Sequence, residues 1–344
     1  MATEVTKLRK SFLPLSRGFI RYCSTHSVSS LQVLQKGIED AVEAKTYQKI
    51  PDLLTSFEQA RQNPSPFSFL STYPQNLRTQ IVDEILQSFI PLRPRSRPQI
   101  AYSFLLSYIL QSSNPFPLSF AILQRTLRSG CVPVPQTQLL LSSAWLEHRL
   151  NQSQSVQSIL LDMKSIGYHP DCGTCNYLIS SLCAVDQLME AVKVLKGMAG
   201  AGCVPYLESY DTVIKAMCKL RRTAEAVDMI KLMVEKLGLT PRQGTLVKVA
   251  AALRANREIW RAAEMIELLE REGHVVGFES YELVVEGCLE CGEYILAGKV
   301  AIWMTEKGLL PYIKVRQKVV ERLAGIGEWK LACTVRQRFS ELRS

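Results

Sequence analysis

Hydrophobic positions in the second half of the chain recur at the spacing of helices, and these helices come in pairs. In the stretch 207–236, apolar side chains repeat at intervals of three and four residues, which places them on one face of each helix. They are Tyr210, Val213, Ile214 and Met217 in the first helix, and Ala226, Met229, Ile230 and Met233 in the second. Gly238 and Pro241 then end the second helix. This pattern predicts an antiparallel helical hairpin.

The hairpin pattern returns about every 35 residues. Prolines that follow a glycine close successive units at Pro133, Pro170, Pro205, Pro241 and Pro311. A small residue also recurs at one place in the second helix, at Ala191, Ala226, Ala262, Ala297 and Ala332. Hairpins that cannot bury their apolar faces alone must stack on their neighbours. The sequence therefore predicts an all-α fold, a right-handed superhelical solenoid of antiparallel helical hairpins.

We expect the repeat array to span residues 134–344. Its units are about 134–171, 172–206, 207–242, 243–277, 278–312 and 313–344. Before the array, apolar helical segments at 48–62, 76–90, 99–111 and 117–129 are separated by proline-rich joints. We interpret residues 31–133 as degenerate repeats and a cap. Thr174, Ser209 and Ser280 are expected to cap the N-termini of first helices.

The net charge of +9 is concentrated at the two ends of the chain. Residues 1–30 hold five basic side chains and one acid, residues 313–344 hold eight and three, and the stretch between them is neutral overall. A basic, serine-rich and acid-poor N-terminus is typical of an organellar transit peptide. We therefore predict a transit peptide or disordered segment at 1–30 and a mitochondrial location, with the plastid as the alternative. No segment reaches the length of about 18 apolar residues that a membrane span needs.

Two consecutive units share a detailed residue pattern. The first contains Thr174-Cys-Asn-Tyr-Leu-Ile179, Cys183, Ala191, Met198, Gly202 and Pro205, and the second contains Ser209-Tyr-Asp-Thr-Val-Ile214, Cys218-Lys219, Ala226, Met233, Gly238 and Pro241. This pattern resembles the pentatricopeptide repeat, closely over about 134–344 and loosely over about 65–133. The resemblance implies binding of single-stranded organellar RNA along a concave face formed by the first helices, with one base read per repeat. It implies a non-catalytic role in RNA processing, stabilisation or translation.

The resemblance also assigns residues to base reading. The fifth and the last residue of each unit choose the base, which gives the pairs Asn176 with Tyr206, Asp211 with Arg242, Val247 with Gly277, and Glu282 with Tyr312. Lys219 occupies the place where the family has a lysine that contacts phosphate. Lys248, Arg254, Lys314 and Lys318 are further basic residues of the first helices. The RNA-binding candidates are Asn176, Tyr206, Asp211, Lys219, Arg242, Lys248, Arg254, Lys314 and Lys318.

Several of these positions depart from the family pattern. Asn176 is a usual base selector, but none of the four final residues is the Asp, Asn or Ser that the family has there. Gly173, Glu208, Gly244 and Glu279 stand where the family has aliphatic residues that pack against the base. Glutamates that face a phosphate backbone repel it. These departures favour the alternative of a protein-interaction scaffold, a ribosome-associated or complex-assembly subunit with little or no RNA specificity.

The candidate chemistry is limited. The two CxxC pairs, Cys172 with Cys175 and Cys288 with Cys291, lie three units apart, too far to share one zinc ion. The four histidines form no constellation with an acid and a nucleophile, and no glycine-rich phosphate loop is present. We therefore expect no enzymatic activity, no metal or cofactor, and no small-molecule substrate. The four tryptophans are expected to pack within or between hairpins; they are Trp145, Trp260, Trp303 and Trp329.

Overall fold

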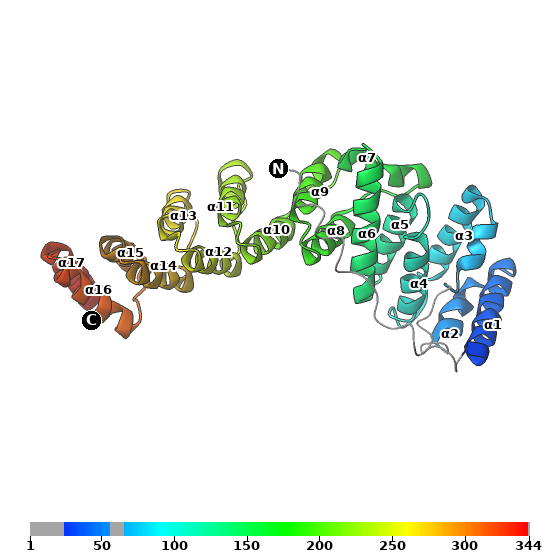
Figure 1. Cartoon of the computed structure of the whole chain (residues 1–344), viewed down its shortest axis with the longest axis horizontal. Coiled ribbons are helices and arrows are strands. Elements are labelled where there is room, and N and C mark those ends of the chain that lie inside the picture. The colour runs from blue at the N-terminus through cyan, green and yellow to red at the C-terminus, as the bar shows by residue number, and fades with distance from the viewer. Residues whose placement is uncertain (1–23, 56–64, 343–344) are drawn as a thin grey trace, which may run out of the picture. The chain divides into compact units, whose positions relative to one another are not determined.

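The regular structure of the chain is entirely helical in the part that the computed structural model describes, residues 24–55 and 65–342 (Figure 1). Contacts divide it into two compact units, one of residues up to Ile109 with 128–133, the other of residues 110–127 with 134 onward. The predicted all-α class is confirmed for these residues. Most of the predicted transit peptide lies outside them, and helix α1 begins at Ser24, within the range 1–30 assigned to it.

The first unit holds four helices, α1 (Ser24–Glu43), α2 (Ile50–Thr55), α3 (Gln75–Ser88) and α4 (Gln99–Ile109). Short 3-10 turns lie at Tyr47–Lys49 and Ser68–Thr72. Its core contains the fully buried side chains of Ile38, Leu54, Leu70, Ile85 and Tyr102. The helices predicted at 76–90 and 99–111 match α3 and α4, whereas the one predicted at 48–62 is described only as far as Thr55.

The second unit begins with three helices that precede the regular hairpins. They are α5 (Phe116–Arg128), α6 (Pro135–Asn151) and α7 (Val156–Leu161), the last followed by a 3-10 turn, Asp162–Ile166. The sequence placed α5 before the array, but nearly all of this helix clusters with the array in the structure. The reason is its heavily buried apolar surface, in which Phe116 packs edge-on against Trp145 at 5.4 Å between ring centroids.

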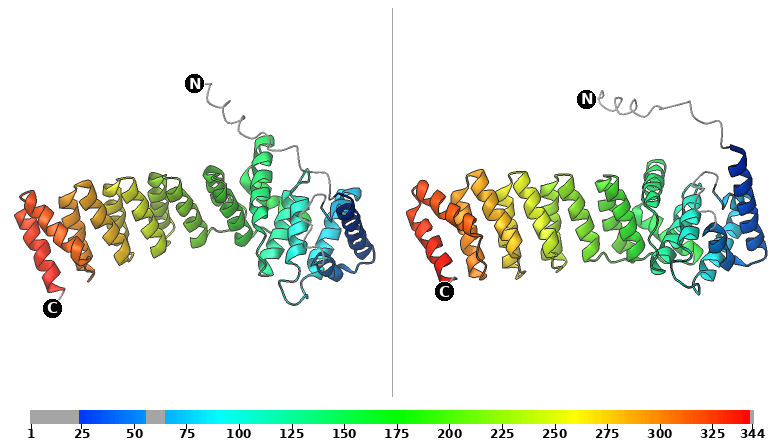
Figure 2. Two further views of the ribbon diagram at one scale, coloured as in Figure 1. Left: turned by 60° about the horizontal axis from the view of Figure 1, so that its bottom comes forward. Right: turned by 90° about the horizontal axis from the view of Figure 1, so that it is seen from below.

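Five hairpins follow one another in the second unit, and Figure 2 shows them side by side. Their first helices are α8 (Cys172–Ala184), α10 (Leu207–Lys219), α12 (Gln243–Ala255), α14 (Phe278–Cys291) and α16 (Ile313–Gly325). Their second helices are α9 (Leu188–Gly200), α11 (Thr223–Lys231), α13 (Ile259–Arg271), α15 (Tyr294–Glu306) and α17 (Trp329–Glu341). Each first helix contacts the first helix of the next hairpin, so the apolar faces are buried between neighbours. The predicted solenoid of antiparallel hairpins is confirmed.

The repeated small residues and glycines have the predicted roles. Ala191, Ala226, Ala262, Ala297 and Ala332 are all buried, each on the second helix of its hairpin. Gly167, Gly202, Gly238, Gly273 and Gly308 lie at the ends of successive units with φ between 60° and 85°. Glycine adopts this left-handed conformation without the steric cost that a Cβ atom brings, and it ends the second helix there.

The predicted N-caps are wrong. Thr174 and Ser209 lie three residues inside their helices, and the caps are Asp171 and Tyr206. The Thr174 N–H donates to the Asp171 carboxylate at 2.9 Å, and the Tyr206 N–H donates to the Ser209 hydroxyl at 3.3 Å. Ser280 is displaced in the same way, because Gly277 precedes α14. The helices therefore begin one turn earlier than the hydroxyl residues suggested.

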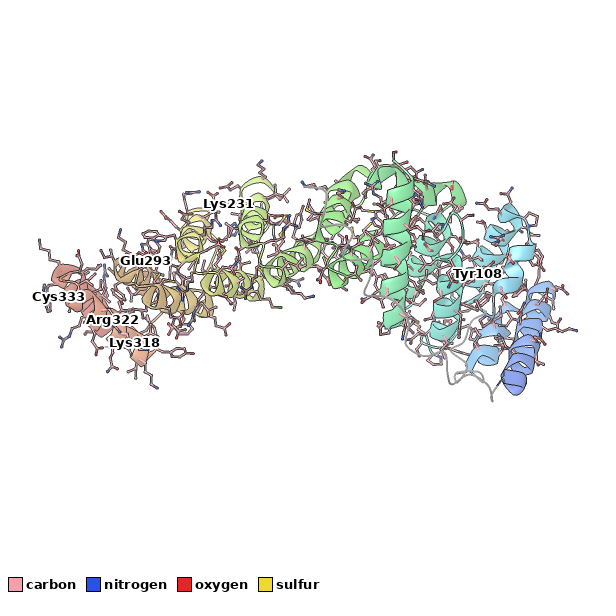
Figure 3. The ribbon with its side chains drawn as sticks, viewed as in Figure 1. Tyr108, Lys231, Glu293, Lys318, Arg322 and Cys333 are labelled. Carbon is pink, nitrogen blue, oxygen red and sulfur yellow. The ribbon has the colours of Figure 1, made fainter. Side chains whose placement is uncertain are left out.

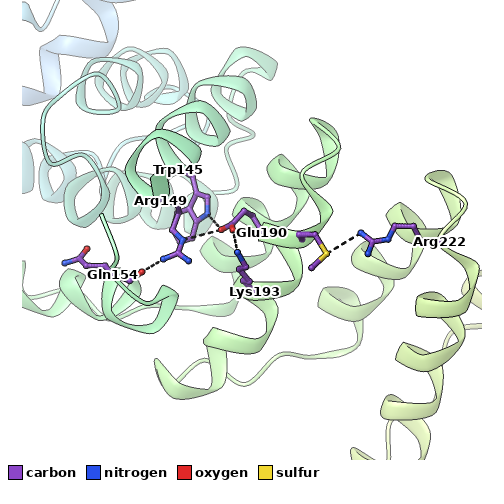
Figure 4. Close-up of polar contacts among 7 residues, drawn as sticks. Trp145, Arg149, Gln154, Glu190, Lys193 and Arg222 are labelled. Atoms are coloured by element: carbon purple, nitrogen blue, oxygen red, sulfur yellow. Dashed lines mark hydrogen bonds and ion pairs between the residues drawn. The ribbon is translucent and has the colours of Figure 1, made fainter. Parts of the chain in front are cut away.

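Glu190 of α9 joins the first hairpin to α6 (Figure 4). Its carboxylate accepts a hydrogen bond from Trp145 Nε1 at 3.3 Å and pairs with Arg149 Nε at 3.4 Å and with Lys193 Nζ at 2.6 Å. The side chain is only 14% exposed. Because a buried carboxylate is stable only when its oxygens are paired, Trp145 and Arg149 of α6 fix α9 against α6, while Lys193 pairs with Glu190 within α9.

The last second helix, α17, differs from the others on the face turned away from the preceding hairpins. Four residues after the aligned alanine, the earlier second helices bury Leu195, Ile230, Ile266 and Ala301. The equivalent residue of α17 is the exposed Arg336, and the exposed Cys333 and Ser340 lie beside it on the same helix face. We call these three residues the polar outer face of α17.

Candidate functional site

The candidate site is the row of exposed side chains on α8, α10, α12, α14 and α16, which we call the first-helix face. Along it, the fifth residue of two units contacts the N-cap residue of the next first helix. Arg242 Nε lies 3.2 Å from an Asp211 carboxylate oxygen, and the Tyr312 N–H donates to Glu282 at 3.2 Å. The structure thus brings together pairs that the sequence assigned to base reading.

Asp211 is occupied by contacts within the chain. Its carboxylate is 1% exposed, accepts a hydrogen bond from the Thr245 hydroxyl at 2.8 Å through Oδ1, and forms the ion pair with Arg242 through Oδ2. Thr245 belongs to α12, so the acid at the reading position also ties two hairpins together. Arg242 remains about half exposed.

Glu282 is buried at the equivalent position of α14. One carboxylate oxygen accepts the Tyr312 N–H, and the other is buried without a hydrogen-bond partner among the described residues. Burial raises the pKa of Glu282 above its ordinary value; the Tyr312 N–H opposes this shift, Glu286 adds to it, and Arg316 opposes it. The site therefore holds a carboxylate that is costly to keep charged.

Asn176 differs from both acids. Its amide nitrogen and oxygen are buried and make no hydrogen bond within the described part of the chain. Tyr206, its assigned partner, is 42% exposed and donates through its hydroxyl to Glu208 at 3.3 Å. Burial raises the pKa of Tyr206, Glu208 raises it further, and the nearby Asn176 side chain opposes the rise. Asn176 thus keeps donor and acceptor capacity beside an exposed aromatic ring.

Val247 and Gly277 are linked indirectly. Gln243, four residues before Val247, accepts a hydrogen bond from the Gly277 N–H at 2.7 Å and donates to the Val275 carbonyl. Neither Val247 nor Gly277 has a polar side chain with which to read a base.

The candidate cations fall into two groups. Lys219 pairs with Asp186 at 3.1 Å, and Arg254 pairs with Glu286 and Glu290, which holds its guanidinium only 23% exposed. Lys248, Lys314 and Lys318 are exposed, and none has an ion-pair partner within residues 31–342 outside the gap at 56–64. Lys318 and Arg322 lie on α16 (Figure 3), where Arg322 stacks over the Tyr294 ring at 5.7 Å. Among these candidates, the unpaired positive charge is thus on α12 and α16.

The tryptophan prediction is wrong at two positions. Trp145 is fully buried, but Trp260 is 56% exposed and Trp329 is 65% exposed. Trp260 lies two residues before the aligned Ala262, where the exposed Met189 and Ile295 lie in their own helices. That position is off the apolar stripe, a signal that the sequence contained.

The cysteines of the two CxxC pairs belong to their own hairpins. Cys175 and Cys288 are buried, and Cys172 donates to the Val204 carbonyl at 3.2 Å. Burial raises the pKa of the Cys288 thiol to about 12. In residues that the structure describes, no three His, Cys, Asp or Glu side chains gather in a way that could hold a metal ion. None of the described helices is long and apolar enough to cross a membrane.

Comparison with known proteins gives consistent similarities. A family model described as pentatricopeptide repeat-containing protein matches residues 204–300, and one described as PPR repeat matches residues 173–203. A pentatricopeptide repeat-containing protein of Arabidopsis thaliana is 61% identical over the full length of both chains.

More distant similarities cover parts of other proteins. The small ribosomal subunit protein mL103 (rPPR7) of Arabidopsis thaliana is 27% identical over 35% of this chain and 29% of its own length. The crystal structure of PPR10 from maize is 14% identical with a TM-score of 0.40, and the match covers 92% of this chain and 54% of that one.

Proposed function

The chain belongs to the pentatricopeptide-repeat family, and on this premise we propose that it binds single-stranded organellar RNA along the first-helix face without catalysing a reaction. The observation that carries the proposal is the register of the reading positions. Asn176, Asp211, Val247 and Glu282 occur at one place in four successive hairpins, and Asp211 and Glu282 contact the N-cap residue of the next first helix.

The mechanism is passive. Asn176 supplies an amide that can donate to and accept from a base edge, and the exposed Tyr206 ring beside it offers a surface for stacking. Lys248, Lys314 and Lys318 supply charge for the phosphates. An RNA held in this way is protected, kept open, or presented to a processing or translation factor. Asp211 and Glu282 contribute little reading, because their carboxylates are turned to partners within the chain.

We place the protein in an organelle and, within that proposal, in the mitochondrion rather than the plastid. The basic, acid-poor N-terminus supports import, and the partial similarity to the ribosomal protein mL103 is compatible with an organellar role.

A protein-interaction scaffold is the second candidate. The contacts that occupy Asp211 and Glu282 favour it, as does the similarity to a ribosomal subunit protein. If the reading residues of the first-helix face bind one another, this face recognises bases weakly and presents fixed side chains to a protein partner.

A salt titration with short single-stranded RNA separates the two candidates. The wild-type chain is expected to bind with an affinity that falls steeply as salt rises. The triple variant carries Lys248→Gln, Lys314→Gln and Lys318→Gln together. We expect the magnitude of its slope of log K against log salt to decrease by about 2, since each phosphate contact contributes roughly 0.7.

The matched control removes the same charge outside the first helices, in Lys231→Gln and Lys299→Gln on α11 and α15 and in Lys236→Gln on the π-helical segment Leu232–Lys236, and is expected to keep the wild-type slope. Absent or salt-independent binding by the wild-type chain would support the scaffold. If the wild-type chain binds RNA, its affinities for the homopolymers of A, C, G and U can be compared. In Asn176→Ala these four affinities should differ less from one another, because the substitution removes a base-edge contact.

A further inference from the structure

The turns that join first to second helices form an edge of the array with an unusual backbone. At equivalent places in successive hairpins, Asp186, Arg221, Arg257 and Gly292 have positive φ, between 57° and 81°. Glycine adopts this conformation freely, whereas a residue with a Cβ atom does so at an energetic cost. Two neighbouring turns thus hold an arginine where later turns have glycine.

These turns are fixed to one another. Lys219 pairs with Asp186 at 3.1 Å across two turns. In the next pair of turns, Thr223 Oγ1 donates to Glu258 at 2.7 Å, and Asn256 Nδ2 donates to the Arg221 carbonyl at 3.4 Å. The backbones that carry the two left-handed arginines are therefore linked by hydrogen bonds.

The side chains of Arg221 and Arg257 remain uncommitted although their charged neighbours are paired. Arg222 binds Glu225, and Arg261 binds Glu258, both within one helical turn. Arg221 and Arg257 are exposed and take part in no ion pair with any residue whose side chain the structure describes. The edge thus presents two exposed guanidinium groups without an ion-pair partner among the described residues.

An aromatic ring and a cavity adjoin this charge. Trp260, 56% exposed, follows Arg257 by three residues. A cavity of about 570 Å³ lies between α12 and α14 and is lined by Ala251, Arg254, Ala255, Arg257, Leu283, Glu290 and Cys291. Guanidinium groups bind phosphate in a planar, two-point geometry, and exposed aromatic rings stack on bases without regard to sequence.

We propose that Arg221, Arg257 and Trp260 form a second polynucleotide contact, at the turn edge and outside the first-helix face. Arg221 and Arg257 bind phosphates of one single strand, and a base next to them stacks on Trp260. This inference rests on the proposed function and assigns part of the phosphate binding to the turns. It also explains why Lys219, which is bound to Asp186, need not supply that contact.

The structure offers a variant that removes the charge without harming the fold. Arg221→Gly with Arg257→Gly installs the residue found at Gly292 and Gly327, so Tm should stay equal or rise. We expect the RNA salt slope to decrease by about 1.4, for two phosphate contacts, and the affinity at 0.1 M salt to fall on the order of tenfold. Lys236→Gln with Lys299→Gln, which has the same net charge, should match the wild type.

Trp260→Ala provides an independent arm, because alanine already occupies the equivalent position at Ala224. It should weaken RNA binding about tenfold and leave the salt slope unchanged, since stacking releases no counterions. A merely structural role for Trp260 would instead lower Tm.

The outcomes are distinct. If the wild-type chain binds no single strand, the proposed function itself fails. If it binds RNA and the double glycine variant binds with the same affinity and slope, only the turn edge is overturned. If that variant keeps RNA binding but loses binding to polyglutamate, the edge serves an acidic protein, and the polynucleotide assignment is wrong.

Discussion

At the scale of single residues, the reading positions show how one place in a repeat can hold groups in different states. Asn176 has a buried amide without hydrogen bonds, Asp211 is neutralised by Arg242, and Glu282 has one oxygen unpaired. Burial raises the pKa of Glu282 above its ordinary 4.5. The folded chain therefore takes up a proton at a higher pH than the unfolded chain does, and stability rises as the pH falls through the folded pKa.

Glu282→Gln should accordingly raise Tm at pH 7, because it removes a charge that burial disfavours while the side-chain oxygen can still accept the Tyr312 N–H. The gain should shrink as the pH approaches 4.5, where the wild-type carboxyl is also neutral. Calorimetry between pH 4.5 and pH 8 measures both effects. The exposed Glu321→Gln on α16 is the control, and a lower Tm in Glu282→Gln at pH 7 would show that Arg316 stabilises the carboxylate.

The sequence located the reading positions but not their chemical state. Register follows from the period, whereas the ion pair of Asp211 depends on where the Arg242 side chain turns at the start of α12. The exposure of Trp260 was missed for a different reason. The prediction considered only that tryptophan is apolar and not that Trp260 lies two residues before Ala262, off the apolar stripe. The left-handed turn at Arg221 was not predicted, although the alignment of Arg221 with Gly292 and Gly327 was a sign of it.

At the scale of helices, the aligned alanines set how closely the hairpins approach. Ala262 of α13 is fully buried, so a larger side chain has no space. We expect Ala262→Leu to destabilise the array by about 1–3 kcal/mol, the usual cost of overpacking. Thermal or urea unfolding measures the loss.

Ala224→Leu is the matched control on α11, because Ala224 is exposed, and it should change stability by less than about 0.5 kcal/mol. Equal effects of the two substitutions would mean that the recurrent alanine reflects helix propensity rather than close packing.

Helix boundaries were predictable where glycine and proline mark them and less so elsewhere. Gly202 and Gly238 end their units as expected, while the helix starts were placed three residues late. Serine and threonine are common N-caps, but in these helices they stand at the third helical position. The N-cap is Asp171 in α8, Tyr206 in α10 and Gly277 in α14.

At the scale of the molecule, the contacts predict that disturbances stay local. Each hairpin of the second unit touches its neighbours in sequence, so its stability depends chiefly on them. Val335→Ala in α17, at a fully buried position, should cost roughly 2 kcal/mol. Amide hydrogen exchange should accelerate in α16 and α17, less in α14 and α15, and not in α8 and α9.

The exposed Ser340→Ala provides the reference for that experiment. Faster exchange throughout the array would indicate one cooperative core and contradict the nearest-neighbour arrangement. The division of the chain was only partly readable from sequence, because α5 lacks the repeat pattern and reveals its association through packing of Phe116 on Trp145.

The polar outer face of α17 bears on how copies of the chain behave at high concentration. A stack of hairpins can in principle be extended by the first hairpin of another copy, and such head-to-tail joining does not close and yields filaments. Arg336 and Ser340 present charge and a hydroxyl where the earlier hairpins present Leu, Ile or Ala to a neighbour. Desolvating these groups against an apolar surface is unfavourable, so the polar outer face of α17 is a poor docking surface for a hairpin of another copy.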